Sequence, residues 1–188
     1  FALRDASGAN LFDNGLHSGS DLMRRAVAGC IAGMPGATLI FAPHANSYGR
    51  SAPESNAPVG ATWGYENRTC ALRIPAGPSA QRVIEHRSAG ADANPYLVVA
   101  AVAGAALMGI EDDLVAPEPI LGPARGQRIL QVPTDWDEAI APFEASPKIA
   151  RMFPAALIEA LVAVKRQEQA RCAAMDAAAL AHATHARV

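Results

Sequence analysis

Hydrophobic residues recur at helical spacing early in the chain, after a polar segment. One face of the expected helix is apolar, at positions 22, 26, 27, 30 and 31. Ser18 or Ser20 can cap its N-terminus. Pro35 and Gly36 follow, so we expect this helix to end at about residue 34. Residues 1–17 are rich in Gly, Asn and Asp and predict a loop or a short hairpin.

Beyond Gly36 the apolar residues come in short runs broken by Pro and Gly, which is typical of β-strands. The expected strands cover residues 38–41, 59–63, 69–74 and 82–87. Residues 43–58 are rich in Ser, Asn and Pro and predict a long connection without secondary structure. Connections of this length are often functional.

The longest apolar run, residues 96–110, has a helix-start signal in front of it. Asn94 can cap the helix and Pro95 suits its first turn. The run is shorter than the roughly 18 to 20 residues that cross a bilayer, so it predicts a buried helix.

The rest of the chain predicts one irregular stretch and three more helices. Residues 111–133 are rich in Pro, and the helices are expected at residues 135–144, 146–152 and 155–181. Strands and helices do not alternate as βαβ units, so we predict an α+β fold with a mainly antiparallel, curved sheet and packed helices.

Composition narrows the class of protein. With 188 residues, 51% of them hydrophobic, the chain can bury one sizeable core but not two. A net charge of -2 gives no global attraction to nucleic acid or to an anionic membrane. Three separated cysteines indicate neither a disulfide framework nor a zinc site, and no secretory leader opens the chain, so a cytoplasmic protein is expected. The abrupt start at Phe1 suggests a fragment.

Arginine dominates the basic residues and gathers in one region. Between His44 and Arg87 there are five arginines, at positions 50, 68, 73, 82 and 87, and three glutamates, at positions 54, 66 and 85. Glu85 and Arg87 are two apart, so a strand would place both on one face. Arg68 and Arg73 are five apart, so both can serve one site only if Arg68 precedes the strand or a bulge intervenes.

Two interpretations of these arginines remain open on the residues alone. They could be solvated arginines at a strand edge, with Glu85 as an ordinary ion-pair partner. Alternatively, their planar, fork-shaped guanidinium groups could bind carboxylate or phosphate oxygens.

Several motifs, in order, resemble the catalytic domain of glutamine synthetases. They are Asn-Arg-Thr at 67–69, Arg-Ile-Pro at 73–75, Glu-His-Arg at 85–87 and Ala-Asn-Pro-Tyr-Leu at 93–97. Further matches lie at 8–12, 46–50, 57–58 and 165–168, so the resemblance covers nearly the whole chain. It implies that residues 1–188 are the C-terminal part of this catalytic domain, without the N-terminal β-grasp domain and the first part of the catalytic domain.

The resemblance also implies a reaction and a set of site residues. ATP phosphorylates the γ-carboxylate of L-glutamate, and an amine then displaces the phosphate. Arg50 corresponds to an arginine that binds glutamate, and Arg87 to a catalytic arginine that also binds glutamate, near the reacting carboxylate. Arg68 corresponds to a catalytic arginine on the ATP phosphates, and Arg73 to an ATP-binding arginine. Glu85 corresponds to a ligand of the divalent ion, Mg²⁺ or Mn²⁺. Full-length members of the family form large, ring-shaped homo-oligomers.

Departures from the family pattern point to the acceptor. Ammonia-using members usually carry a glutamate before Ala-Pro, where this chain has Asn56. Trp63 and the residues after it resemble branches that use larger amines, such as γ-glutamylpolyamine synthetases, so a larger amine or polyamine is expected. An ammonia-using glutamine synthetase and a non-catalytic scaffold are the alternatives. The family commonly has an arginine where Val83 stands here, which leaves the role of Arg82 open. His86 points away from Glu85 and Arg87 on a strand, which favours packing or the surface.

Overall fold

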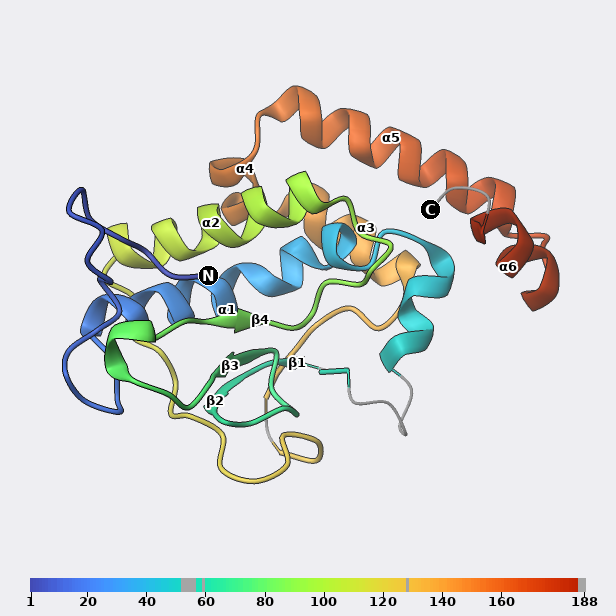
Figure 1. Cartoon of the computed structure of the whole chain (residues 1–188). Coiled ribbons are helices and arrows are strands. Elements are labelled where there is room, and N and C mark those ends of the chain that lie inside the picture. Colours follow the sequence, from blue (N-terminus) through green and yellow to red (C-terminus); the bar gives the residue numbers. More distant parts are fainter. Residues whose placement is uncertain (52–56, 59, 128, 186–188) are drawn as a thin grey trace.

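Helices make up most of the regular secondary structure, and the strands are short. The computed structural model describes residues 1–51, 57–58, 60–127 and 129–185. The helices are α1 (Asp21–Phe41), α2 (Pro95–Glu111), α3 (Trp136–Ala145), α4 (Pro147–Met152), α5 (Ala155–Cys172) and α6 (Ala177–His185), with the 3₁₀ helices η1 (Ala45–Ser51) and η2 (Ser79–Gln81). The strands are β1 (Gly60–Ala61), β2 (Trp63–Tyr65), β3 (Leu72–Ile74), β4 (Glu85–His86) and β5 (Leu130–Gln131). Figure 1 shows α2 alongside α1, and the strands on the other side of α1.

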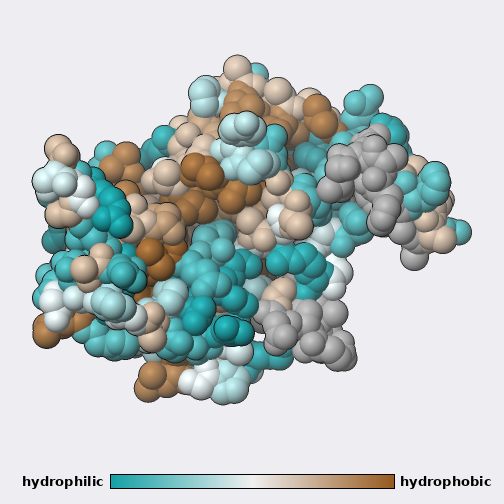
Figure 2. All heavy atoms as spheres, viewed as in Figure 1, coloured by the Kyte–Doolittle hydropathy of each residue, from teal (hydrophilic) through white to brown (hydrophobic). Residues whose placement is uncertain are grey.

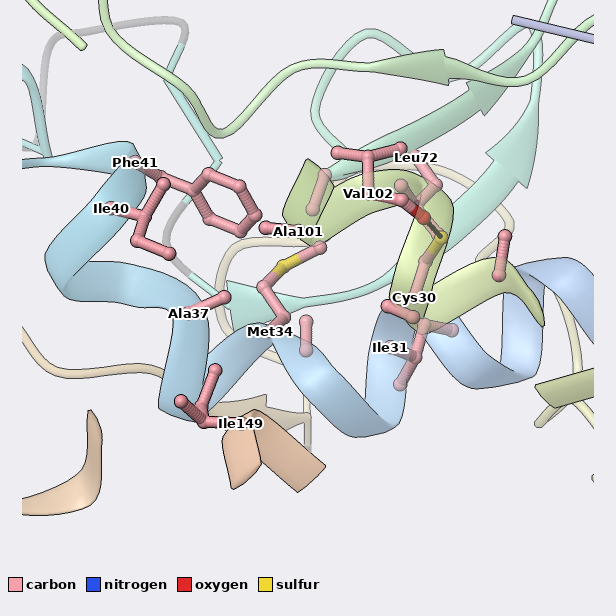
Figure 3. Close-up of a cluster of buried hydrophobic side chains, with 14 of the residues drawn as sticks. Cys30, Ile31, Met34, Ala37, Ile40, Phe41, Leu72, Ala101, Val102 and Ile149 are labelled. Atoms are coloured by element: carbon pink, nitrogen blue, oxygen red, sulfur yellow. Dashed lines mark hydrogen bonds between the residues drawn. The ribbon is translucent and has the colours of Figure 1, made fainter. Parts of the chain in front are cut away.

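The core lies around α1, which is buried along most of its length. Two glycines allow α1 and α2 to touch through their backbones: a Cβ built on Gly109 would lie 2.6 Å from the Cα of Gly29. Figure 3 shows the side chains beyond this contact meeting residues from α2, α4 and β3; those labelled are Cys30, Ile31, Met34, Ala37, Ile40, Phe41, Leu72, Ala101, Val102 and Ile149. Burial of each large aliphatic side chain contributes about 2 kcal/mol, so this packing holds the strands against the helices.

The first helix is longer than its sequence predicts. The expected helix end at residue 34 and the expected strand at 38–41 are both wrong, because α1 continues through Pro35 to Phe41. Its last turns bury Leu39, Ile40 and Phe41 in the core. The burial of this apolar face outweighs the backbone hydrogen bond that proline removes.

The strands form two small sheets. In one, β2 pairs in parallel with β3, and β3 pairs antiparallel with β4. In the other, β1 pairs antiparallel with β5. The predicted α+β class is therefore confirmed. Strands β1 to β4 lie within or beside the expected strands at 59–63, 69–74 and 82–87 but are shorter, and β5 lies in a stretch that was expected to be irregular.

Two of the expected helix starts are confirmed by their caps. Ser20 accepts a hydrogen bond from the Met23 amide at the start of α1, and Asn94 accepts from Tyr96 and Leu97 at the start of α2. The expected single helix at 155–181 is wrong, because α5 ends at Cys172 and α6 begins at Ala177. The connection at 43–58 was expected to lack secondary structure, yet it contains η1. None of the helices in the described ranges is long and apolar enough to cross a membrane.

Candidate functional site

The pairing of β3 with β4 brings an arginine and a glutamate together. Arg73 lies opposite Glu85 in the antiparallel register. The Arg73 Nη1 donates a hydrogen bond to Glu85 Oε2 over 2.7 Å, and the Arg73 side chain is only 15% exposed. Figure 2 shows a hydrophilic area over these strands, below the hydrophobic surface of α2. The polar face of this small sheet is therefore where the site residues meet.

Arg87 contacts the same glutamate as Arg73. Its Nη1 donates to Glu85 Oε1 over 3.0 Å, which agrees with the prediction that Glu85 and Arg87 share a face. Burial raises the pKa of the Glu85 carboxyl, but the hydrogen bonds from Arg73 and Arg87 outweigh burial and hold the pKa below its ordinary value of 4.5. Glu85 is therefore ionised at neutral pH, between two guanidinium groups.

Glu66 is a fourth member of this cluster that the sequence did not single out. Its carboxylate accepts from Arg73 Nη2 over 3.1 Å and from the Ala76 amide. Its backbone has a φ of 51°, in the left-handed region that non-glycine residues rarely adopt. This turn directs the side chain back toward β3. Glu66 is one of the three glutamates counted in this region of the sequence. A left-handed backbone is usually signalled by glycine or asparagine at the position itself, and position 66 is a glutamate.

Arg68 lies in the turn before β3, so the first of its two predicted placements is correct. Its side chain is exposed and forms no hydrogen bond with the described residues. Its charge nevertheless contributes to lowering the pKa of Glu66, after the larger effects of the Ala76 amide and of Arg73. Arg68 is thus close to the cluster, with its guanidinium open to solvent.

Arg50 reaches the same region from η1. Its Nη1 donates to the backbone oxygen of Ser88 over 3.2 Å, and Ser88 follows Arg87 in the chain. The structure therefore brings Arg73, Glu85 and Arg87 into direct contact and connects Arg50 to the residue next to them. Asn56, on which the expectation of a larger acceptor rests, lies outside the described residues.

Arg82 and His86 pack inside the structure and do not join the arginine–glutamate cluster. Arg82 is 2% exposed and donates to the backbone oxygens of Pro75 and Leu16, which ties the β3–β4 connection to the N-terminal loop. The His86 ring packs against Phe41 at a centroid distance of 4.6 Å, and burial lowers its pKa from 6.5 to about 4. The expectation that His86 serves packing agrees with this contact.

Trp63 and Tyr65 lie beside a cavity of about 570 Å³ between α1 and the segment after α2. Both are anchored, because Trp63 Nε1 donates to Pro117 and the Tyr65 hydroxyl donates to Ser18, each over 2.7 Å. A second cavity, of about 460 Å³, lies between the end of α1, the start of α2 and the middle of α5. None of the five predicted site residues lines either cavity.

The described residues fit a divalent ion only in part. Glu85 offers a carboxylate, the ligand type that Mg²⁺ and Mn²⁺ prefer. Each of its oxygens already accepts a hydrogen bond from an arginine, and within the described residues no three His, Cys, Asp or Glu side chains come together to hold a metal. A divalent ion held by Glu85 would therefore need further ligands from outside the described residues.

The fold and the cluster define an α+β protein with guanidinium groups arranged for carboxylate or phosphate oxygens. The chain belongs to the glutamine synthetase family, because residues 1–179 match its catalytic domain.

Known relatives include enzymes named for products in which a γ-glutamyl group is joined to an amine. The γ-glutamylethanolamide synthetase GlnA4 of Streptomyces coelicolor is 43% identical over 145 residues, which cover 77% of this chain and 31% of that protein. The γ-glutamylputrescine synthetase PuuA of Escherichia coli is 37% identical over 142 residues, covering 76% of this chain and 30% of that protein. The solved structure of GmaS in complex with ADP superposes with a TM-score of 0.81 at 29% identity, covering 93% of this chain and 42% of that chain. The chain thus spans about a third of the length of these curated relatives.

Proposed function

We propose that the complete protein joins the γ-carboxylate of L-glutamate to an amine at the expense of ATP, and that this chain supplies the arginine side of the active site. The observation that carries the proposal is the ionised Glu85 held between Arg73 and Arg87, with Arg50 bonded to the next residue of the chain. Family membership supports the same reaction class.

The reaction needs positive charge at two stages. A glutamate oxygen attacks the terminal phosphorus of ATP, the bond to the bridging oxygen breaks, and ADP leaves γ-glutamyl phosphate behind. The amine nitrogen then attacks the acyl carbon, phosphate leaves with the electrons of the C–O bond, and the nitrogen loses a proton. Guanidinium groups stabilise the charge that develops on phosphoryl and carboxyl oxygens.

Each arginine has a proposed role in these stages. Arg50 binds the substrate glutamate, Arg87 faces its reacting carboxylate, and Arg68 and Arg73 contact the phosphates of ATP. The open guanidinium of Arg68 supports its role, because it is not engaged with other described side chains. Glu85 contributes one ligand to a divalent ion, which when bound neutralises phosphate charge. The position of the chain in the domain and the ring assembly of the complete protein also remain predictions.

We further propose that the acceptor is an amine larger than ammonia. Asn56 stands where ammonia-using members carry an acid, and relatives are named for ethanolamine and putrescine products. The test measures glutamate-dependent phosphate release by the complete protein with ammonium, ethanolamine or putrescine. We expect faster release with ethanolamine or putrescine than with ammonium. Rapid turnover with ammonium alone would overturn the proposal of a larger acceptor. If no amine caused phosphate release, the proposed ligase activity itself would be wrong.

A matched pair of variants tests the arginine site. Arg87→Lys keeps the charge but loses the planar fork, so kcat should fall about a hundredfold. Arg151→Lys is the control, because Arg151 forms exposed ion pairs with Asp112 and Glu111 at the end of α2. It should leave kcat unchanged. Equal activity of the two variants would show that Arg87 has no part in the reaction.

A further inference from the structure

Two segments that carry site arginines are held together by three hydrogen bonds. The Gly90 amide donates to the backbone oxygen of Phe41 over 2.9 Å. Arg50 Nη1 donates to the Ser88 oxygen over 3.2 Å, and Ser47 Oγ donates to Asp92 Oδ2. These bonds connect the end of α1 and η1 to the residues directly after Arg87. The distance between Arg50 and Arg87 therefore depends on this junction.

Ser47 is the centre of the junction. It is 5% exposed, and its Oγ also accepts from the His44 amide over 3.0 Å. Its own amide donates to the His44 oxygen over 2.9 Å. One hydroxyl thus closes the first turn of the segment and joins it to Asp92. Within the described residues, this bond is the only one that the Asp92 carboxylate forms.

The geometry of a 3₁₀ helix makes Ser47 and Arg50 act together. With three residues per turn, side chains at positions i and i+3 lie above one another. Ser47 and Arg50 are three apart in η1, so both point to the same neighbouring segment, where they meet Asp92 and Ser88. Because 3₁₀ hydrogen bonds are weak, the direction of so short a helix depends on such side-chain bonds.

We propose that Asp92, acting through Ser47, is a positioning residue that fixes the Arg50 guanidinium relative to Arg87 and so sets the affinity for the acidic substrate. This inference rests on the proposed function, because it takes Arg50 as the residue that binds glutamate. In this role Asp92 acts through Ser47 and not by contact with the substrate. Its effect is confined to the step that depends on the placement of Arg50.

The kinetic test compares Asp92→Ala, Ser47→Ala, the double variant and Asp92→Asn in the complete protein. Each alanine variant should raise the KM for glutamate about tenfold, since small misplacement of a binding group is costly. The kcat and the KM for ATP should stay within about twofold. The double variant should be no worse than Ser47→Ala, because Ser47→Ala already removes the bond that Asp92→Ala breaks. Asp92→Asn keeps an oxygen that accepts from Ser47 and should restore the KM.

The control is Ser146→Ala, which removes a comparable serine bond, to the Ile149 amide at the start of α4, away from η1. It should leave the KM for glutamate unchanged. An unchanged KM for glutamate in Asp92→Ala, or an equal rise in the KM for ATP, would refute the positioning role.

A second measurement separates this inference from the proposed function. If the wild-type protein released no phosphate in response to glutamate, the proposed function would fail. Hydrogen exchange of the 188-residue chain would still test the junction. The amides of His44 and Ser47 should exchange faster in Asp92→Ala than in the wild type or in Ser146→Ala. Unchanged exchange would show that Asp92 does not hold η1.

Discussion

At the scale of single residues, the site is a set of guanidinium–carboxylate pairs centred on Arg73 and Glu85. Arg73 binds Glu85 through Nη1 and Glu66 through Nη2, so its two outer nitrogens serve two carboxylates. The fork of the guanidinium group is what allows this division. A single ammonium on a flexible chain cannot reproduce it.

Arg73→Lys should therefore weaken the cluster while keeping its charge. We expect the free energy of unfolding to fall by about 1 kcal/mol, because at least one hydrogen bond to a carboxylate is lost. Urea denaturation at pH 7 measures this change. Arg151→Lys is the control and should cost less, because the Arg151 pairs are exposed. Equal losses in both variants would show that the Arg73 pairs contribute no more than surface ion pairs.

His86 should make the free energy of unfolding depend on pH in a range above that in which the carboxylates titrate. Its pKa is about 4 in the folded chain and 6.5 in the unfolded chain, so the unfolded state binds more protons between these values. The free energy of unfolding should fall by roughly 2 kcal/mol between pH 7 and pH 5. Lowered pKa values such as that of Glu85 remove stability only below about pH 4.5.

NMR titration of the His86 ring measures its pKa directly, and urea denaturation at the two pH values measures the stability. In His86→Leu, the difference between pH 7 and pH 5 should shrink. A His86 ring that titrates near pH 6.5 would contradict the prediction.

The sequence predicts those site features that depend on spacing and misses those that depend on a turn. The shared face of Glu85 and Arg87 follows from strand alternation alone, and the structure agrees. The contact of Glu66 with Arg73 depends on a left-handed backbone at Glu66, which the residue type at that position does not signal. Arg82 is buried by the N-terminal loop, a contact between distant segments that spacing cannot predict.

At the scale of elements, local signals are reliable at helix starts and fail within buried helices. Ser20 and Asn94 cap helices as expected, because capping is a local hydrogen bond. Pro35 does not end α1, because the apolar side chains after it are buried by other elements. Tertiary packing decides such cases, and it is not encoded in a short window of sequence.

The contact between α1 and α2 gives a sharp prediction at this scale. A Cβ at Gly109 would meet backbone atoms, including the Cα of Gly29 at 2.6 Å, so Gly109→Ala should reduce the free energy of unfolding by at least about 2 kcal/mol. Gly104→Ala, in the same helix, is the matched control. There the new Cβ would meet side-chain atoms only, the nearest being Met152 Cγ at 2.9 Å, so a shift of Met152 can relieve the contact without separating two backbones.

Thermal or urea denaturation of both variants provides the comparison. Gly104→Ala should cost less than Gly109→Ala, because a side chain can shift more easily than a backbone and the helix propensity of alanine regains about 1 kcal/mol. Similar stabilities of the two variants would show that the helices can separate at Gly109 without loss.

At the scale of the whole molecule, the fold class was predictable and the strand pairing was not. The lack of βαβ alternation indicates an α+β arrangement, which the structure has. The sequence does not indicate that β1 pairs with β5, or that β2 and β3 run parallel. Those pairings join segments with little local preference and depend on the completed core.

The last prediction concerns what this chain can do by itself. Three of the proposed site residues, Arg73, Glu85 and Arg87, meet in one cluster, and Arg50 and Arg68 lie close to it. Glu85 is the one proposed metal ligand among these five described residues. One carboxylate cannot hold the ions that neutralise ATP during phosphoryl transfer. We therefore expect no ATP-dependent ligation by the 188-residue chain alone, measured as phosphate release with glutamate and putrescine.

The complete protein is the positive control in that assay and should release phosphate under the same conditions. We expect the complete protein and the isolated chain to differ because the isolated chain supplies charge from one side of the active site only. The arginines of this chain can attract the anionic substrates, but the charge of the transferred phosphoryl group has to be balanced from both sides. Ligation of any amine by the isolated chain would mean that its own side chains complete the site, and the proposed division of the active site would then be wrong.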